Sequence, residues 1–128
     1  MLTWDELKAY ARSRYTLADD EEDLFSIVWE YENGRKQEIK VSRFQLLDRD
    51  FIEFNSAVCS LESLDPVDAL QRNVDFGLGM LALRGETYVV RHTALLDTLD
   101  LEEFELPLRL IASSADILEA ELTGEDDF

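Results

Sequence analysis

The chain has 128 residues, of which 29 are acidic and 12 basic, so its formal net charge is −17. This length fits a single domain, and 46% hydrophobic residues support a packed core and argue against a disordered chain. The charge argues against direct binding of nucleic acid or an anionic membrane surface, and it attracts basic partners. One cysteine, Cys59, excludes an internal disulfide, and its apolar neighbours predict a buried thiol.

The N-terminal segment predicts a helix followed by a linker. Thr3 and Glu6 have the spacing of a capping box, so we expect a helix from there to about Arg14. Residues 19–23 are five consecutive carboxylates, which repel each other and predict a solvated linker. The first residues lack the features of a signal peptide, and no apolar run approaches the roughly 20 residues that cross a bilayer. We therefore expect a cytoplasmic protein that makes no membrane contact.

Two strands, 24–31 and 36–47, are predicted on either side of Glu32-Asn33-Gly34. A two-residue turn would place apolar side chains opposite charged ones, whereas a three-residue loop with Gly34 in the left-handed conformation aligns the apolar positions. One residue of slip turns every side chain to the other face, so this alignment decides the register. The predicted cross-strand pairs are Phe25 with Val41, Ile27 with Ile39, and Glu30 with Lys36.

The middle of the chain predicts a third strand and a short helix. After a turn at residues 47–50, the strand spans residues 51–61 and has two partly apolar faces, which indicates that it is covered on both sides or faces a partner. Asp65 as the cap and Pro66 at the first helical position then predict a helix that ends near Gly77. One face of this helix carries Val67, Leu70 and Val74.

The C-terminal part predicts a hairpin and a long helix. Residues 80–84 and 87–96 flank a turn at Gly85-Glu86. Apolar residues then recur every three or four positions from Leu101 to Leu122, as in an amphipathic helix. Pro107 interrupts the pattern, which indicates either a kink or a helix that starts near Pro107 after a short turn. The acidic tail, residues 124–128, is expected to fray, so the domain spans residues 1–123.

These elements predict an α+β fold in the order α-β-β-β-α-β-β-α. Two hairpins imply a mostly antiparallel, twisted sheet, packed by the N- and C-terminal helices. The element order, size, acidity and closing helix resemble the type III secretion chaperone-like fold, which the class I secretion chaperones (the Tir chaperone, CesT, group) share with the YbjN family. The segment 99–118 is similar to the last helix of YbjN-like proteins, and the likeness spans Trp4 to Leu122, with Pro107 as a departure.

The resemblance implies a homodimer in which apolar patches hold an extended segment of another protein. It also implies that Val67, Leu70 and Val74 form the subunit interface, with burial of this face against the chain's own sheet as the alternative. The family supplies no catalytic residue.

No motif in the chain indicates catalysis or a cofactor. The sequence Gly77-Leu78-Gly79-Met80-Leu81-Ala82 has the letters of a dinucleotide-binding fingerprint, but a helix is expected before it and a strand after it, the reverse of what phosphate binding needs. His92 is the only histidine, and with one cysteine it cannot make a typical zinc site. We expect His92 to be structural, and the protein not to be an enzyme.

Aromatic residues are the candidates for partner contact, because they are enriched at interfaces. Tyr31 and Phe54 are predicted as contacts, and Phe25, Ile27 and Trp29 as core. We expect a dimeric module that captures an apolar or extended segment of another protein. The alternative is an acidic decoy or immunity-type inhibitor that covers a basic surface, and its binding would collapse as salt is added.

Overall fold

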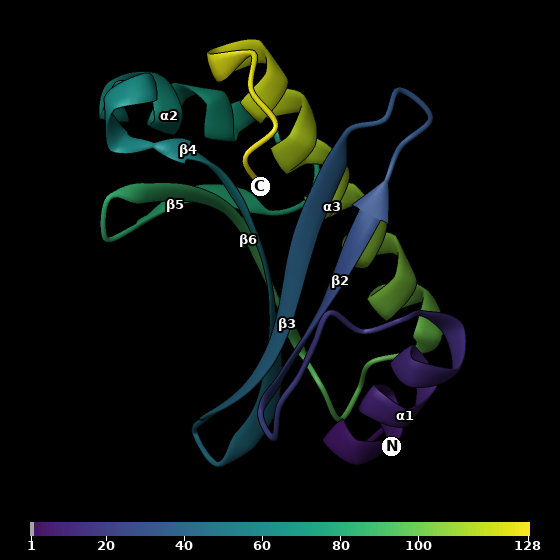
Figure 1. Cartoon of the computed structure of the whole chain (residues 1–128). Helices are drawn as coiled ribbons and strands as arrows, with labels where there is room; N and C mark the ends of the chain where they lie inside the picture. Colours follow the sequence, from purple (N-terminus) through teal and green to yellow (C-terminus); the bar gives the residue numbers. More distant parts are fainter. Residues whose placement is uncertain (1) are drawn as a thin grey trace.

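Six strands form one antiparallel sheet in the computed structural model, which describes residues 2–128 (Figure 1). The strands are β1 (Asp19–Asp20), β2 (Leu24–Glu30), β3 (Lys36–Leu46), β4 (Arg49–Ser60), β5 (Met80–Arg84) and β6 (Thr87–Leu95). Their order across the sheet is β1-β2-β3-β4-β6-β5. The helices are α1 (Trp4–Arg14), α2 (Pro66–Arg72) and α3 (Leu101–Thr123), with 3-10 turns at Leu61–Ser63 and Asn73–Asp75. The predicted α+β class and layout are confirmed, with the short strand β1 added.

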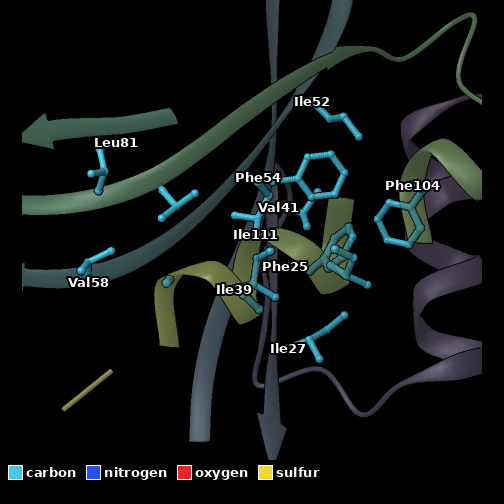
Figure 2. Packing of buried hydrophobic residues seen from close by; sticks show 14 of the residues in the cluster. Phe25, Ile27, Ile39, Val41, Ile52, Phe54, Val58, Leu81, Phe104 and Ile111 are labelled. Carbon is cyan, nitrogen blue, oxygen red and sulfur yellow. The ribbon is translucent and has the colours of Figure 1, made fainter. Parts of the chain in front are cut away.

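The core lies between one face of the sheet and the helices α1 and α3 (Figure 2). Phe25 of β2 stacks on Trp4 of α1, with ring centroids 5.4 Å apart, and meets Phe104 of α3 edge-on at 6.3 Å. Phe54 of β4 packs against the same Phe104 at 6.0 Å. All four side chains are buried, and full burial of one such side chain contributes roughly 1.5–3 kcal/mol. This aromatic cluster therefore holds both helices on the sheet.

The predicted helix start and hairpin register are confirmed. Thr3 accepts a hydrogen bond from the backbone N–H of Glu6 at 3.2 Å, and the Glu6 carboxylate accepts one from the N–H of Thr3. Gly34 has φ of +85°, as the three-residue loop requires. The pairs between β2 and β3 include Phe25 with Val41, Ile27 with Ile39, and Glu30 with Lys36.

The acidic run of residues 19–23 is exposed as expected, but it is not merely a linker. Asp19 and Asp20 form β1 and pair with β2. Asp20 accepts from the guanidinium of Arg12 at 2.7 Å and lies 3.1 Å from the Lys8 ammonium. These two cations on α1 lower the pKa of Asp20 to about 2, Arg12 having the larger effect. Opposite charge from the preceding helix thus offsets the repulsion that predicted a linker.

Helix α3 runs through Pro107 and does not begin there. Asp100 caps it, accepting from the N–H of Glu103 at 2.8 Å, and the Glu103 carboxylate accepts in return from the N–H of Asp100. This second capping box places the start at Leu101, so the prediction of a helix starting near Pro107 is wrong. Pro107 is buried within the helix.

The strands β3 and β4 are separated at one end, where residues 36–39 of β3 and 56–60 of β4 do not pair with each other. They pair from Lys40 to Leu46 of β3 with Arg49 to Asn55 of β4, after which β4 continues only beside β6. The buried Gln37 amide bridges the gap, donating at 2.8 Å to the Ser56 hydroxyl and at 2.7 Å to the carbonyl of Ala57. The sheet therefore opens on the side where α3 ends (Figure 1).

A bulge explains the two apolar faces predicted for the third strand. Ala57 pairs with Val89 and Cys59 with Tyr88, so Val58 is an extra residue in β4. The bulge changes the alternation of side chains, and both Val58 and Cys59 are buried. The predicted burial of the Cys59 thiol is thus confirmed, and this burial raises its pKa.

Gly79 is the glycine whose replacement we expect to cost most. Its φ is +82°, and a Cβ there would lie 2.5 Å from Cδ1 of Ile111 and 3.2 Å from the carbonyl oxygen of Arg91. We expect Gly79→Ala to lower the free energy of unfolding by about 1–3 kcal/mol, because it adds backbone strain and a clash with α3. Urea denaturation measures this change. Gly77→Ala, which has open space around its Cβ position, is the control and should change stability by less than about 1 kcal/mol.

Candidate functional site

Helix α3 has a second apolar stripe, which the fold leaves uncovered. The buried stripe packs on the sheet through Phe104, Leu108 and Ile111. Leu106, Leu110 and Ile117 lie on the outer side of the helix and are 50%, 41% and 62% exposed. Monomeric proteins rarely expose several large apolar side chains side by side without a use for them. This outer stripe is therefore one wall of the candidate site.

The segment after α2 forms the opposite wall of an apolar groove of about 640 Å³. Arg72 of α2 pairs with Glu121 of α3 at 3.3 Å and so ties the two walls together. The groove is lined by Arg72, Asp75, Phe76, Gly77, Leu78, Leu106, Leu110, Ser114, Ile117 and Leu118. Its volume falls in the range of sites that hold a ligand or a few side chains of a partner. The predicted site residues do not include this groove, because its walls come from segments about 30 positions apart in sequence.

The predicted interface face, which spans α2 and the 3-10 turn after it, is exposed to solvent. Val67, Leu70 and Val74 are 60%, 70% and 86% exposed, and Ala69 is the buried residue of the helix instead. The alternative prediction, burial of this face against the chain's own sheet, is therefore wrong. The role of the three residues in a dimer stays a prediction. Because each helical residue turns by about 100°, Arg72 and the groove lie on the other side of α2 from Leu70.

Asn73, just after α2, protects the outer strand of the sheet. Its side-chain oxygen accepts from the N–H of Leu81 at 2.6 Å, and its side-chain nitrogen donates to the carbonyl of Leu81 at 3.2 Å. Leu81 belongs to β5, the last strand on this edge. One side chain thus satisfies both peptide groups of an edge residue.

The two aromatic residues predicted as partner contacts, Phe54 and Tyr31, differ in how deeply they are buried. Phe54 is fully buried in the core against Phe104, so its prediction as a contact is wrong. Its alternation with Ile52 on β4 points it to the helices, which the two-faced pattern of that strand obscured. Tyr31 is half-buried, and burial, helped by Asp116, raises the pKa of its phenol to about 12. Tyr31 stays a predicted contact.

The residues considered for chemistry lie in structural settings. His92 packs beside Phe54, with ring centroids 5.7 Å apart, and burial lowers the pKa of its imidazole. Gly77 and Gly79 follow α2 and its 3-10 turn and precede strand β5, the reverse of the order that a dinucleotide site needs, as expected. Of the predicted core residues, Phe25 and Ile27 are buried, and Trp29 packs on the core while remaining half-exposed.

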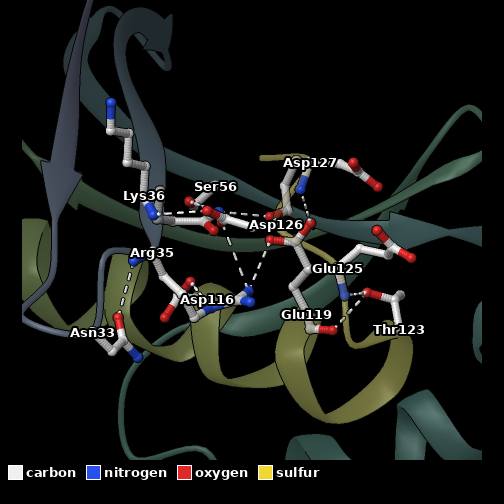
Figure 3. A network of polar contacts seen from close by, with 12 residues as sticks. Asn33, Arg35, Lys36, Ser56, Asp116, Glu119, Thr123, Glu125, Asp126 and Asp127 are labelled. Atoms are coloured by element: carbon white, nitrogen blue, oxygen red, sulfur yellow. Dashed lines mark hydrogen bonds and ion pairs between the residues drawn. The ribbon is translucent and has the colours of Figure 1, made fainter.

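A cluster of carboxylates around Arg35 lies where the sheet opens (Figure 3). The guanidinium of Arg35 is 2.9 Å from Asp116, 3.4 Å from Glu119 and 3.8 Å from Asp126. These carboxylate oxygens lie within 4.8 Å of one another, and the arginine takes the central place. Burial raises the pKa of Glu119. The sequence could not show this cluster, because it joins a hairpin to residues more than 80 positions away.

Comparison with known proteins assigns no family: no family model matches the chain, and no curated protein matches it. Among the described residues 2–128, no helix is both long and apolar enough to cross a membrane. The resemblance to the secretion chaperone-like fold is therefore carried only by the pattern and order of the elements.

Proposed function

We propose that this protein is a non-catalytic protein-binding module of the chaperone-like kind, which dimerises and holds an apolar segment of another protein. The observation that carries the proposal is the outer stripe of α3, where Leu106, Leu110 and Ile117 line an apolar groove and each remain at least 41% exposed. A helix or extended segment with apolar residues at matching spacing would fill such a groove.

The dimer would form through the exposed face of α2 and of the 3-10 turn that follows it. Val67, Leu70 and Val74 present three adjacent apolar side chains, and a two-fold axis would bring this patch against its own copy. Pairing through α2 would leave the groove of each subunit free, because the groove lies on the other side of that helix. The proposal thus separates a surface for self-association from a surface for the partner.

Sedimentation equilibrium of the full chain tests the dimer. We expect a dimer for the wild type and a monomer for the variant Leu70→Glu/Val74→Glu, because introduced charges would be desolvated and repel across the axis. Leu46→Glu is the matched control, since Leu46 is 56% exposed and lies on β3, outside the patch. A wild-type monomer at all concentrations, or equal dissociation in the control, contradicts this part of the proposal.

A displayed peptide library, selected on the immobilised protein at high salt, tests the groove. We expect apolar peptides whose affinity falls at least about tenfold in Leu110→Glu and is unchanged in Leu46→Glu. An affinity that depends on basic residues in the peptide, collapses with salt and ignores Leu110→Glu would support the second candidate, an acidic decoy for a basic surface. The net charge of −17 is the observation that favours that candidate.

A further inference from the structure

The segment 124–128, predicted to fray, is instead bound in the opening between β3 and β4. The backbone N–H groups of Lys36 and Glu38 point to the side of β3 from which β4 has separated. The N–H of Glu38 donates to the backbone oxygen of Phe128 at 2.8 Å, and the N–H of Lys36 donates to the Asp126 carboxylate at 3.1 Å. Two donors of a strand edge, which would otherwise lack partners, are thus satisfied by the tail.

The carboxylate cluster holds the beginning of this segment (Figure 3). Asp126 lies 3.8 Å from the guanidinium of Arg35. The N–H of Asp127 donates to the buried Glu119 carboxylate at 2.7 Å. The tail is therefore fixed by backbone and side-chain contacts from both β3 and α3, which corrects the prediction of fraying. The prediction failed because it considered only the polarity of the segment and not the free strand edge beside it.

The end of the segment lies beside a cavity on the face of the sheet that points away from α3. Ile39 and Val41 of β3 point to the core, so Glu38 and Lys40 point the other way. A cavity of about 530 Å³ remains there, lined by Glu38, Lys40, Asn55, Ala57, Arg84, Thr87, Val89, Asp127 and Phe128. Phe128 lines one side of it, so the tail leaves space for a larger occupant.

Basic and acidic side chains both surround this opening, Asp116, Glu119 and Glu38 being the acidic ones. Arg35, Lys40 and Arg84 are near the segment, in a protein that has only 12 basic residues. Arg84 is paired with Glu53 at 2.7 Å, whereas Lys40 is exposed and lines the cavity. An acidic segment that brings backbone acceptors and an aromatic side chain therefore matches the donors, the cations and the cavity together.

We propose that the opening between β3 and β4, which we call the β3–β4 slot, is a binding site for an extended acidic segment in which a carboxylate precedes an aromatic residue by two positions. Residues 126–128, Asp-Asp-Phe, occupy the slot as an internal competitor. A partner's segment of the same chemistry binds by displacing them and adding to the free edge of β3. This site is separate from the α3 groove and the α2 face, so its test can fail without affecting the proposed function.

Fluorescence polarisation with a labelled peptide of residues 123–128 (TGEDDF) tests the slot. The full-length variant Asp126→Ala/Phe128→Ala has a weakened internal competitor, and we expect it to bind the peptide at least about tenfold more tightly than the wild type does. Adding Lys40→Glu to this variant should abolish the binding, whereas adding Arg43→Glu, the same change of charge beside Asp23, should not. The peptide TGEADA should bind neither protein.

Amide hydrogen exchange gives a second readout that needs no added ligand. The N–H of Glu38 should exchange slowly in the wild type, faster in Asp126→Ala/Phe128→Ala, and slowly again when the peptide is added. Equal peptide affinity for wild type and variant, absence of binding to the variant, or indifference to Lys40→Glu would each overturn the proposal. An exchange rate of the Glu38 N–H that is the same in the variant as in the wild type would also overturn the proposal.

Discussion

Replacing Phe104 with alanine is expected to lower the free energy of unfolding by about 3–5 kcal/mol. Phe104 is fully buried and contacts the rings of Phe25 and Phe54, and Tyr10 of α1 meets it edge-on at 6.1 Å. Its loss leaves a cavity where α1, α3 and two strands meet, and the surrounding backbone cannot close it without moving a helix. Urea denaturation monitored by circular dichroism measures the change.

Leu101→Ala is the control for this experiment. Leu101 lies one turn earlier on the same helix and is 45% exposed, so its truncation should change the free energy of unfolding by less than about 1 kcal/mol. Similar losses for the two variants would mean that α3 does not pack on the sheet through Phe104.

Replacing Arg35 with alanine is expected to lower the midpoint of thermal unfolding by roughly 10 °C at neutral pH. The substitution leaves Asp116, Glu119 and Asp126 close together without their shared cation, and the first two are buried. Removing one partner of a buried charge cluster is far more damaging than removing one from a surface pair. Differential scanning calorimetry measures the midpoint, and Arg43→Ala, which breaks an exposed pair with Asp23, should lower it by only about 2 °C or less.

The loss of stability in Arg35→Ala is expected to depend on pH, and its direction follows from the pKa of Glu119. The pKa of Glu119 is raised by burial, so the folded protein binds this proton more tightly than the unfolded chain does. Protonation then stabilises the fold, and this group adds stability as pH falls from neutral toward the ordinary range of a glutamate. Without Arg35, protonation of Glu119 stabilises the fold by more than it does in the wild type. The difference in unfolding midpoint between Arg35→Ala and the wild type should therefore become smaller as the pH is lowered. A difference that is constant or widens would show that repulsion among these carboxylates is not the cause.

Local rules in the sequence predicted the elements and one register. The capping box at Thr3 and Glu6, the turn at Gly34 and the alternation in β2 and β3 each depend on residues a few positions apart. The capping box at Asp100 and Glu103 has the same spacing as the one at Thr3 and Glu6, and it decides where α3 begins despite Pro107. Interactions between residues close together in sequence are therefore enough to predict most of the secondary structure.

The sites themselves depend on contacts that no local pattern encodes. The groove forms only because α3 lies beside the segment after α2. The β3–β4 slot forms only because β3 and β4 pair along one part of their length and separate along the other. The one signal that could have indicated the separation is Gln37, a polar residue alternating with Ile39 and Val41 on a buried strand. The Gln37 amide replaces the backbone hydrogen bonds that β3 and β4 do not make with each other at this point, and this role is visible only in the folded chain.

The Asn73 side chain has a consequence for how the protein behaves at high concentration. Within β5, Leu81 and Leu83 turn their peptide groups outward, and Asn73 already occupies those of Leu81. At the opposite border the outermost strand is only Asp19–Asp20, whose two negative charges repel a like molecule. Both borders are thus partly blocked, so we expect sheets of adjacent molecules to join by lateral growth less readily than those of a protein with long open edges.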